Sequence, residues 1–69
     1  MISYKPLLKL LIDQEIRKGE LMSRAGISPA TMARLSTNKY VSLEVIDRLC
    51  AALRCQPGDL LEYVEDAKK

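Results

Sequence analysis

The tetrapeptide Gly26-Ile27-Ser28-Pro29 constrains the fold of this chain most, because it ends one helix and begins another within four residues. Glycine tolerates the positive φ of a left-handed residue, so Gly26 is a predicted helix end. Serine is a preferred N-cap, and proline lacks the backbone N–H that would find no partner at the first helical position. The sequence therefore predicts two short helices that meet at a tight turn, with Ile27 folding back into the core.

Each helix of this pair carries one apolar stripe. In the first, Leu21 and Ala25 are spaced i, i+4, with Met22 beside them, so this face is predicted to pack inward. In the second, Met32 and Leu35 are the predicted inward residues. The opposite face is poor in large apolar side chains, and it comprises Pro29, Ala30, Ala33, Arg34 and Thr37.

That outward face carries groups that a DNA major groove can accept. Arg34 is the first candidate for paired hydrogen bonds to guanine, and Thr31 is a candidate for polar contacts. Ala30 or Ala33 can lie against a thymine methyl group, while Pro29 offers no donor. The helix is therefore a candidate base reader, and an ordinary solvated surface is the alternative interpretation of the same residues.

Positive charge is concentrated on the same stretch. Residues 17–39 contain five basic side chains and one acidic side chain, a net charge of +4, and the rest of the chain carries −2. The C-terminal region is acidic and would repel phosphate, through Asp59, Glu62, Glu65 and Asp66. The distribution favours a polyanion at the helix pair, although five bases are also compatible with a solvated surface.

The runs LMSRAGISPATMARL and VSLEVIDRLCAALRCQPGDLLEY resemble the Cro/repressor-type (XRE-like) helix-turn-helix domain of phage repressors and small bacterial regulators. The resemblance implies an all-α, compact, five-helix, lambda-repressor-like DNA-binding domain. It departs from the family pattern at Met22, where a small residue is usual. The phosphate contacts expected for such a domain are Arg17, Lys18, Ser28, Thr37, Asn38 and Lys39.

The segment before the pair predicts a first helix. Pro6 opens it, apolar spacing continues from Leu7 to Ile16, and the helix is predicted to end near Asp13 to Ile16. Leu8, Leu11 and Ile12 are the expected platform for the helix pair.

After the pair, Ser42 is a predicted N-cap for a helix over Leu43–Leu53. Its expected inward stripe is Leu43, Ile46, Leu49, Cys50 and Leu53. Gln56-Pro57-Gly58-Asp59 then starts a fifth short helix that reaches about Leu61. The alternating segments Ile2–Tyr4 and Tyr63–Val64 are able to pair as two short strands.

Composition limits the function classes. With 69 residues and 48% hydrophobic content, the chain predicts one domain over residues 1–69, with the motif at about 18–37. It has no apolar run of roughly 20 residues and no secretion-signal pattern, so we expect a cytoplasmic protein without a membrane partner.

Histidine is absent, and Cys50 and Cys55 alone form no zinc site, so they are expected to be reduced, buried thiols. No phosphate-binding glycine loop or paired carboxylate motif is present, and we expect no enzyme, cofactor or small-molecule ligand.

The expected function is sequence-specific binding of double-stranded DNA by a transcriptional regulator, with repression favoured. One short helix reads few base pairs, so a homodimer is expected, with its helices spaced about 34 Å apart. Candidate interfaces are the end of the fourth helix, the region from Leu60 to Val64, and the terminal strands. Apolar Leu61, Tyr63 and Val64 favour the C-terminal side, and the alternative is that they belong to the domain core. The alternative is a protein-interaction module of the same fold, such as an antitoxin-like or anti-repressor partner. RNA binding is disfavoured because A-form grooves do not admit a helix.

Overall fold

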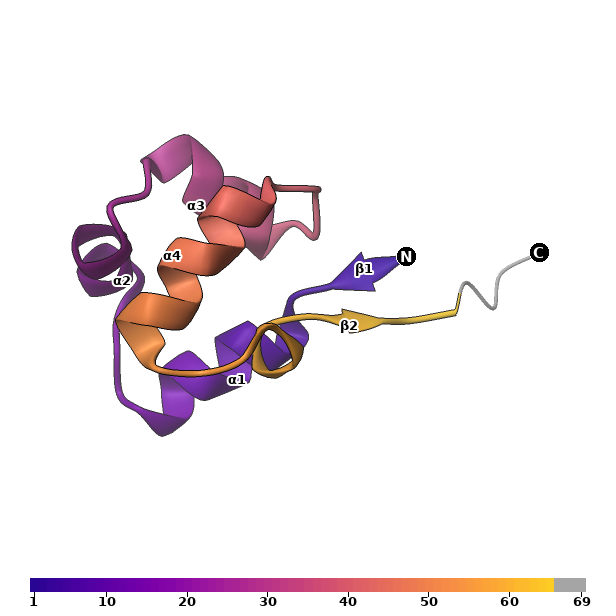
Figure 1. Cartoon of the computed structure of the whole chain (residues 1–69), viewed down its shortest axis with the longest axis horizontal. Helices are drawn as coiled ribbons and strands as arrows, with labels where there is room; N and C mark the ends of the chain where they lie inside the picture. Colours follow the sequence, from indigo (N-terminus) through magenta and orange to yellow (C-terminus); the bar gives the residue numbers. More distant parts are fainter. Residues whose placement is uncertain (66–69) are drawn as a thin grey trace.

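The computed structural model describes residues 1–65 of the chain. Its elements run in the order β1 (Ile2–Ser3), α1 (Lys5–Asp13), α2 (Lys18–Ala25), α3 (Pro29–Ser36), α4 (Leu43–Leu53), the 3-10 helix η1 (Pro57–Asp59) and β2 (Glu62–Tyr63). The helices form a compact body, and β1 and β2 project together from one end of it (Figure 1). The fold is therefore mostly helical, as predicted, with a small two-stranded addition.

One hydrophobic core joins all four α-helices with Tyr4 before α1, Ile16 and Ile27 between helices, and Leu60 after η1. The largest fully buried side chains are Tyr4 before α1, Leu7 of α1, Leu21 of α2, Leu35 of α3, Leu49 of α4 and Leu60 after η1. Each α-helix thus contributes a leucine with no exposed surface to the same cluster. Burying apolar area in this way is the main favourable term in folding.

The turn between α2 and α3 has the predicted geometry. Gly26 adopts φ 66°, in the left-handed region, and its N–H donates to the Met22 carbonyl at 2.9 Å. Ser28 caps α3, because its Oγ accepts from the Thr31 N–H at 3.2 Å, and Pro29 occupies the first helical position. Helix α2 therefore ends, and α3 begins, where local capping chemistry directs.

Helix α1 begins one residue before Pro6 and ends at Asp13, within the predicted end range of Asp13 to Ile16. It ends at Asp13 because Glu15 adopts φ 57° and the Ile16 N–H donates to the Leu11 carbonyl at 2.9 Å, which closes a Schellman-type end. Ile16 leaves the helix but remains buried in the core.

The prediction that Ile12 belongs to the core is wrong, because 75% of its surface is exposed. Leu7 and Leu11 define the inward face of α1, and Ile12 lies about 100° further around the helix. Leu8, another predicted platform residue, is half-buried against the core.

The prediction that Leu43 belongs to the core is also wrong, because 82% of its surface is exposed. Leu43 is the first residue of α4, and helical side chains lean toward the N-terminus, so this one points past the helix start. The inward stripe of α4 begins one turn later and consists of Ile46, Leu49 and Leu53.

The predicted fifth helix is a single 3-10 turn that ends at Asp59 rather than about Leu61. The Leu60 N–H donates to the Pro57 carbonyl at 2.9 Å, and the Gln56 N–H donates to Asp59 Oδ2 at 3.0 Å. These i to i+3 bonds close one turn, and Leu60 then enters the core.

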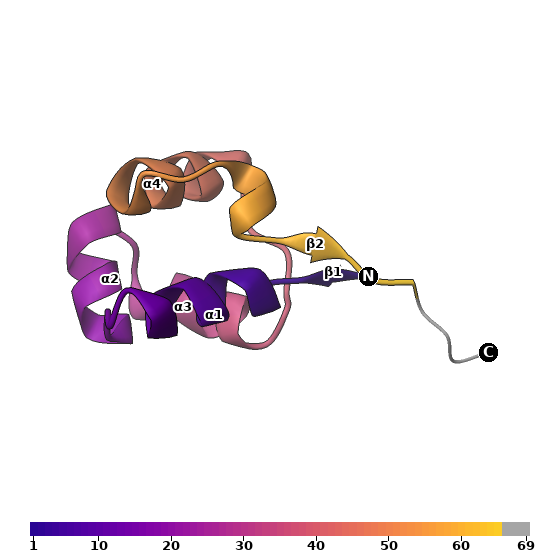
Figure 2. The ribbon, with the colours of Figure 1, turned by 90° about the horizontal axis from the view of Figure 1, so that it is seen from below.

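The two ends of the described chain pair as antiparallel strands, as predicted. Ile2 lies opposite Tyr63 and Ser3 opposite Glu62, and the Val64 N–H donates to the Met1 carbonyl at 2.8 Å. Figure 2 shows this ribbon extending away from the helices. Asp66, the last acid of the predicted acidic region, lies outside the described residues. Within residues 1–65, the helices are too short or too polar to cross a membrane.

Candidate nucleic-acid interface

Helix α3 has one buried face and one exposed face. Met32 and Leu35 are 4% and 0% exposed and dock the helix on the core. Thr31 is half-buried, and the exposed residues of the opposite side are Pro29, Ala30, Ala33, Arg34 and Thr37. All five proposed base contacts therefore lie on a single helix, with four of them exposed to solvent. Their contacts with DNA stay a prediction.

Arg34 is the long donor on this surface. Its Nη1 donates to the Tyr40 carbonyl at 3.4 Å, which is longer than a typical N–H···O bond. This weak contact keeps the guanidinium beside the loop after α3. It uses only Nη1, so the other N–H groups of the guanidinium remain able to donate elsewhere. The planar group can therefore turn toward a guanine edge at small cost.

The start of α3 offers backbone rather than side-chain donors. The Ser28 hydroxyl accepts from the Thr31 N–H at 3.2 Å and donates to Thr31 Oγ1 at 3.1 Å, so Thr31 supplies both partners of the Ser28 hydroxyl. A phosphate at this point would meet the exposed amide end of the helix and its positive dipole. Ser28 is well placed for that role, and Thr31 can donate its own hydroxyl proton to a base while it still accepts from Ser28.

The end of α3 is closed by its own residues. The Thr37 hydroxyl donates to the Ala33 carbonyl at 2.8 Å, and the Lys39 N–H donates to the Arg34 carbonyl at 2.9 Å. Asn38 between them adopts φ 59°. Lys39 is exposed and stays available to an anion, while Thr37 is engaged with the backbone.

Asn38 has a structural role that the sequence did not indicate. Its Oδ1 accepts from the Tyr4 N–H at 2.9 Å, which joins the end of α3 to the start of α1. Tyr4 itself is 2% exposed, and burial raises the pKa of its phenol. Asn38 therefore anchors a buried junction at the place where it was predicted to contact phosphate.

Two of the predicted phosphate contacts lie at the start of α2. Arg17 and Lys18 are exposed, and Lys18 Nζ donates to Ser36 Oγ at 3.1 Å. That bond brings the ammonium from α2 to the end of α3. Arg24, by contrast, forms an ion pair with Glu20 at 2.6 Å on the exposed surface of α2, so its charge is locally offset.

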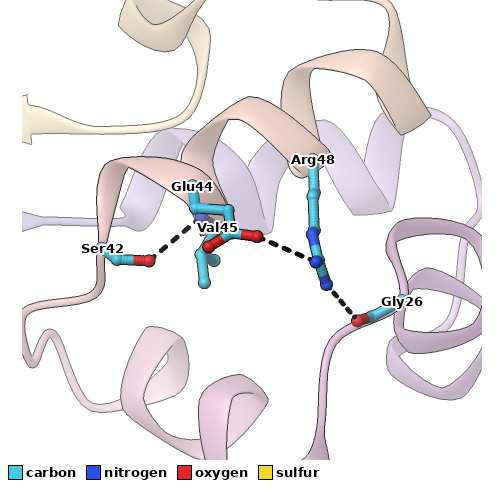
Figure 3. Close-up of polar contacts among 5 residues, drawn as sticks. All are labelled: Gly26, Ser42, Glu44, Val45 and Arg48. Carbon is cyan, nitrogen blue, oxygen red and sulfur yellow. Dashed lines mark hydrogen bonds and ion pairs between the residues drawn. The ribbon is translucent and has the colours of Figure 1, made fainter.

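Sequence reasoning missed Arg48, which connects α4 to the turn. Its Nη1 donates to the Gly26 carbonyl at 3.0 Å, and its Nη2 pairs with Glu44 Oε2 at 3.0 Å (Figure 3). The i, i+4 spacing of Glu44 and Arg48 was visible in the sequence. The bond to Gly26 spans 22 residues and leaves no periodic signal.

The cysteines do not add chemistry to this surface. Cys50 and Cys55 are free and partly buried, at the far end of α4 and just after it. Burial, followed by the neighbouring Cys50, raises the pKa of the Cys55 thiol. A thiol with a raised pKa stays protonated and is a weak nucleophile at neutral pH.

Known proteins are similar to this chain in sequence and in fold. The family model described as the Cro/C1-type HTH DNA-binding domain matches residues 6–66. The HTH-type transcriptional regulator YozG of Bacillus subtilis (strain 168) is 37% identical over 59 residues, which cover 83% of this chain and 70% of YozG. The crystal structure of the transcriptional regulator VanUg superposes with a TM-score of 0.89 at 43% identity, covering 94% of this chain and 87% of VanUg.

Proposed function

Since the chain belongs to the Cro/C1-type helix-turn-helix DNA-binding family, we propose that it is a sequence-specific transcriptional repressor that inserts residues 29–35 into the major groove of double-stranded DNA. Residues 1–69 form one domain in this proposal, with the motif at about 18–37. The regulator acts in the cytoplasm, as a homodimer, and its action includes no catalytic step or cofactor. YozG and VanUg, both named as transcriptional regulators, support the regulatory class.

The division of α3 into two faces carries this proposal. Met32 and Leu35 hold the helix by its inner side, so that its small outer residues allow a close approach to another surface. Arg34 is the one long side chain on that outer side. A helix of this shape suits a groove that admits an α-helix and presents distinct donors and acceptors for each base pair.

Phosphate contacts would position the helix without specifying sequence. Four of the proposed contacts are exposed near the ends of α2 and α3: Arg17, Lys18, Ser28 and Lys39. The Thr37 hydroxyl and Asn38 Oδ1 are already hydrogen-bonded within the protein, so these two residues would contact phosphate through their other polar groups. In this proposal, donors at both ends of α3 bind phosphates on either side of the base that Arg34 reads.

Selection of bound sequences from a random duplex pool at near-physiological salt tests the proposal. We expect an enriched inverted repeat bound by two chains, with half-sites about one helical turn apart. No enrichment, combined with affinity that vanishes as salt rises, would contradict the proposal and favour a protein-interaction module of the same fold.

Arg34→Ala is expected to weaken binding to the selected operator by about 1 to 3 kcal/mol and to relax preference at one base position. The reason is the loss of a planar donor pair that only guanine matches. Binding to the operator and to its single-base variants, measured by fluorescence anisotropy, checks this result.

Lys18→Ala is the matched control for Arg34→Ala, because it also removes one positive charge. It should weaken binding to all sequences alike and lower the slope of log affinity against log salt by about one. Equal effects of both substitutions on every duplex would show that Arg34 does not read a base.

Tyr63→Arg is expected to reduce dimerisation, which analytical ultracentrifugation would detect. Tyr63 is 73% exposed on β2 and lies opposite Ile2 of β1, and the following Val64 is 39% exposed, so the projecting ribbon presents apolar side chains to solvent. An arginine there would place charge in an interface formed by this ribbon.

Tyr40→Arg provides the matched control for Tyr63→Arg. Tyr40 is 76% exposed but lies in the loop after α3, so this change should leave dimerisation intact. A Tyr63→Arg protein that dimerises like the unmodified chain would exclude the ribbon as the interface.

A further inference from the structure

The turn of the motif is held from outside by a single side chain. Gly26 ends α2 in the left-handed conformation, and within residues 1–65 no backbone N–H donates to its carbonyl. Arg48 of α4 supplies the donor instead, at 3.0 Å from Nη1, while Nη2 is fixed by Glu44 (Figure 3). The planar guanidinium thus spans two acceptors with one rigid group.

This bond joins α4 to the point where α3 departs from the body. The interface between α2 and α4 is more extensive than the interface between α3 and α4. Helices α2 and α4 therefore form a common base on which α3 is placed. Met32 and Leu35 hold the body of α3, and the turn sets the direction in which it leaves α2. A displacement of the Gly26 carbonyl would therefore tilt α3 against that base.

We propose that Arg48 is a positioning residue for DNA reading. By holding the Gly26 carbonyl against α4, it sets the angle at which α3 presents Arg34 to the groove. The inference rests on the proposed DNA reading and adds a residue that acts through the turn, without contact to the bases. Glu44 supports it by orienting the guanidinium.

The test compares Arg48→Met and Arg48→Lys with the unmodified chain. For each protein, affinity is measured for the selected operator and for a single-base variant at the position that Arg34 reads, at a temperature where circular dichroism shows all proteins folded. Arg48→Met, which keeps the apolar stem but no donor, is expected to lower the affinity ratio by about threefold or more, the scale of coupling from residues outside a site. Arg48→Lys keeps one donor group and should lower the ratio less.

Two matched controls separate positioning from loss of charge. Arg24→Met removes the same charge and an equivalent i, i+4 ion pair, with Glu20, and should leave the affinity ratio unchanged. Glu44→Gln removes the ion pair but leaves the donor to Gly26, so its effect on the ratio should be smaller than that of Arg48→Met.

The outcomes are distinguishable. An unchanged affinity ratio in folded Arg48→Met and Arg48→Lys proteins overturns the inference while leaving the proposed function intact. A salt slope lowered by about one, with an unchanged ratio, overturns it too and assigns Arg48 to phosphate contact. If the unmodified chain selects no operator, the proposed function is overturned, and the positioning role of Arg48 is overturned as well.

Discussion

Leu49→Ala is expected to lower the free energy of unfolding by about 2 to 5 kcal/mol, whereas Leu43→Ala should change it by no more than about 0.5 kcal/mol. Both leucines lie on α4, but Leu49 is 0% exposed and Leu43 is 82% exposed. Truncating Leu49 leaves a cavity among packed neighbours, and truncating Leu43 removes atoms that already contact water.

Urea denaturation followed by circular dichroism measures both changes. A domain of this size has a total stability of about 3 to 10 kcal/mol, so Leu49→Ala should be substantially unfolded under mild denaturing conditions. Equal losses for the two variants would mean that the start of α4 is covered in solution, for example by a second copy of the chain.

Asn38→Leu is expected to destabilise the fold by about 2 to 5 kcal/mol, because it combines two costs. A leucine at φ 59° adopts a conformation that L side chains disfavour by about 1 to 2 kcal/mol. The Tyr4 N–H also loses its acceptor, which costs about 1 to 3 kcal/mol for a buried donor.

Asn38→Gly separates these two costs and is measured in the same denaturation experiment. Glycine accepts the positive φ without strain but has no side-chain oxygen, so only the cost of the lost hydrogen bond remains. Asn38→Gly should therefore be less destabilising than Asn38→Leu. A neutral Asn38→Leu variant would show that neither the backbone conformation nor the bond to Tyr4 contributes to stability.

Much of the helix-turn-helix motif was predictable because its signals are local. Gly26 and the Ser28-Pro29 pair act on backbone groups within one helical turn, and α2 ends and α3 begins where these residues direct. The inward residues Met32 and Leu35 were also predictable, since their spacing follows the helical period. The candidate base reader Arg34 was identified as the long donor on the other face.

Predictions failed where several apolar residues competed for one face. Ile12 and Leu43 fit an apolar stripe as well as Leu11 and Ile46 do, yet both are exposed. Periodicity shows that a helix is amphipathic, but it does not show how far the neighbouring elements extend along it. The length of the covered face is decided by packing with the other helices.

The sequence by itself determined the helix pair, its turn and the concentration of positive charge, because capping, proline geometry and periodicity operate between residues close in the chain. The tertiary structure decided which apolar residues are covered and which distant groups meet. The Tyr4 N–H finds Asn38 across 34 residues, and Arg48 finds the Gly26 carbonyl across 22. Such bonds form only after the core has brought their elements together, so the packing that buries the leucines also anchors α3 at both ends.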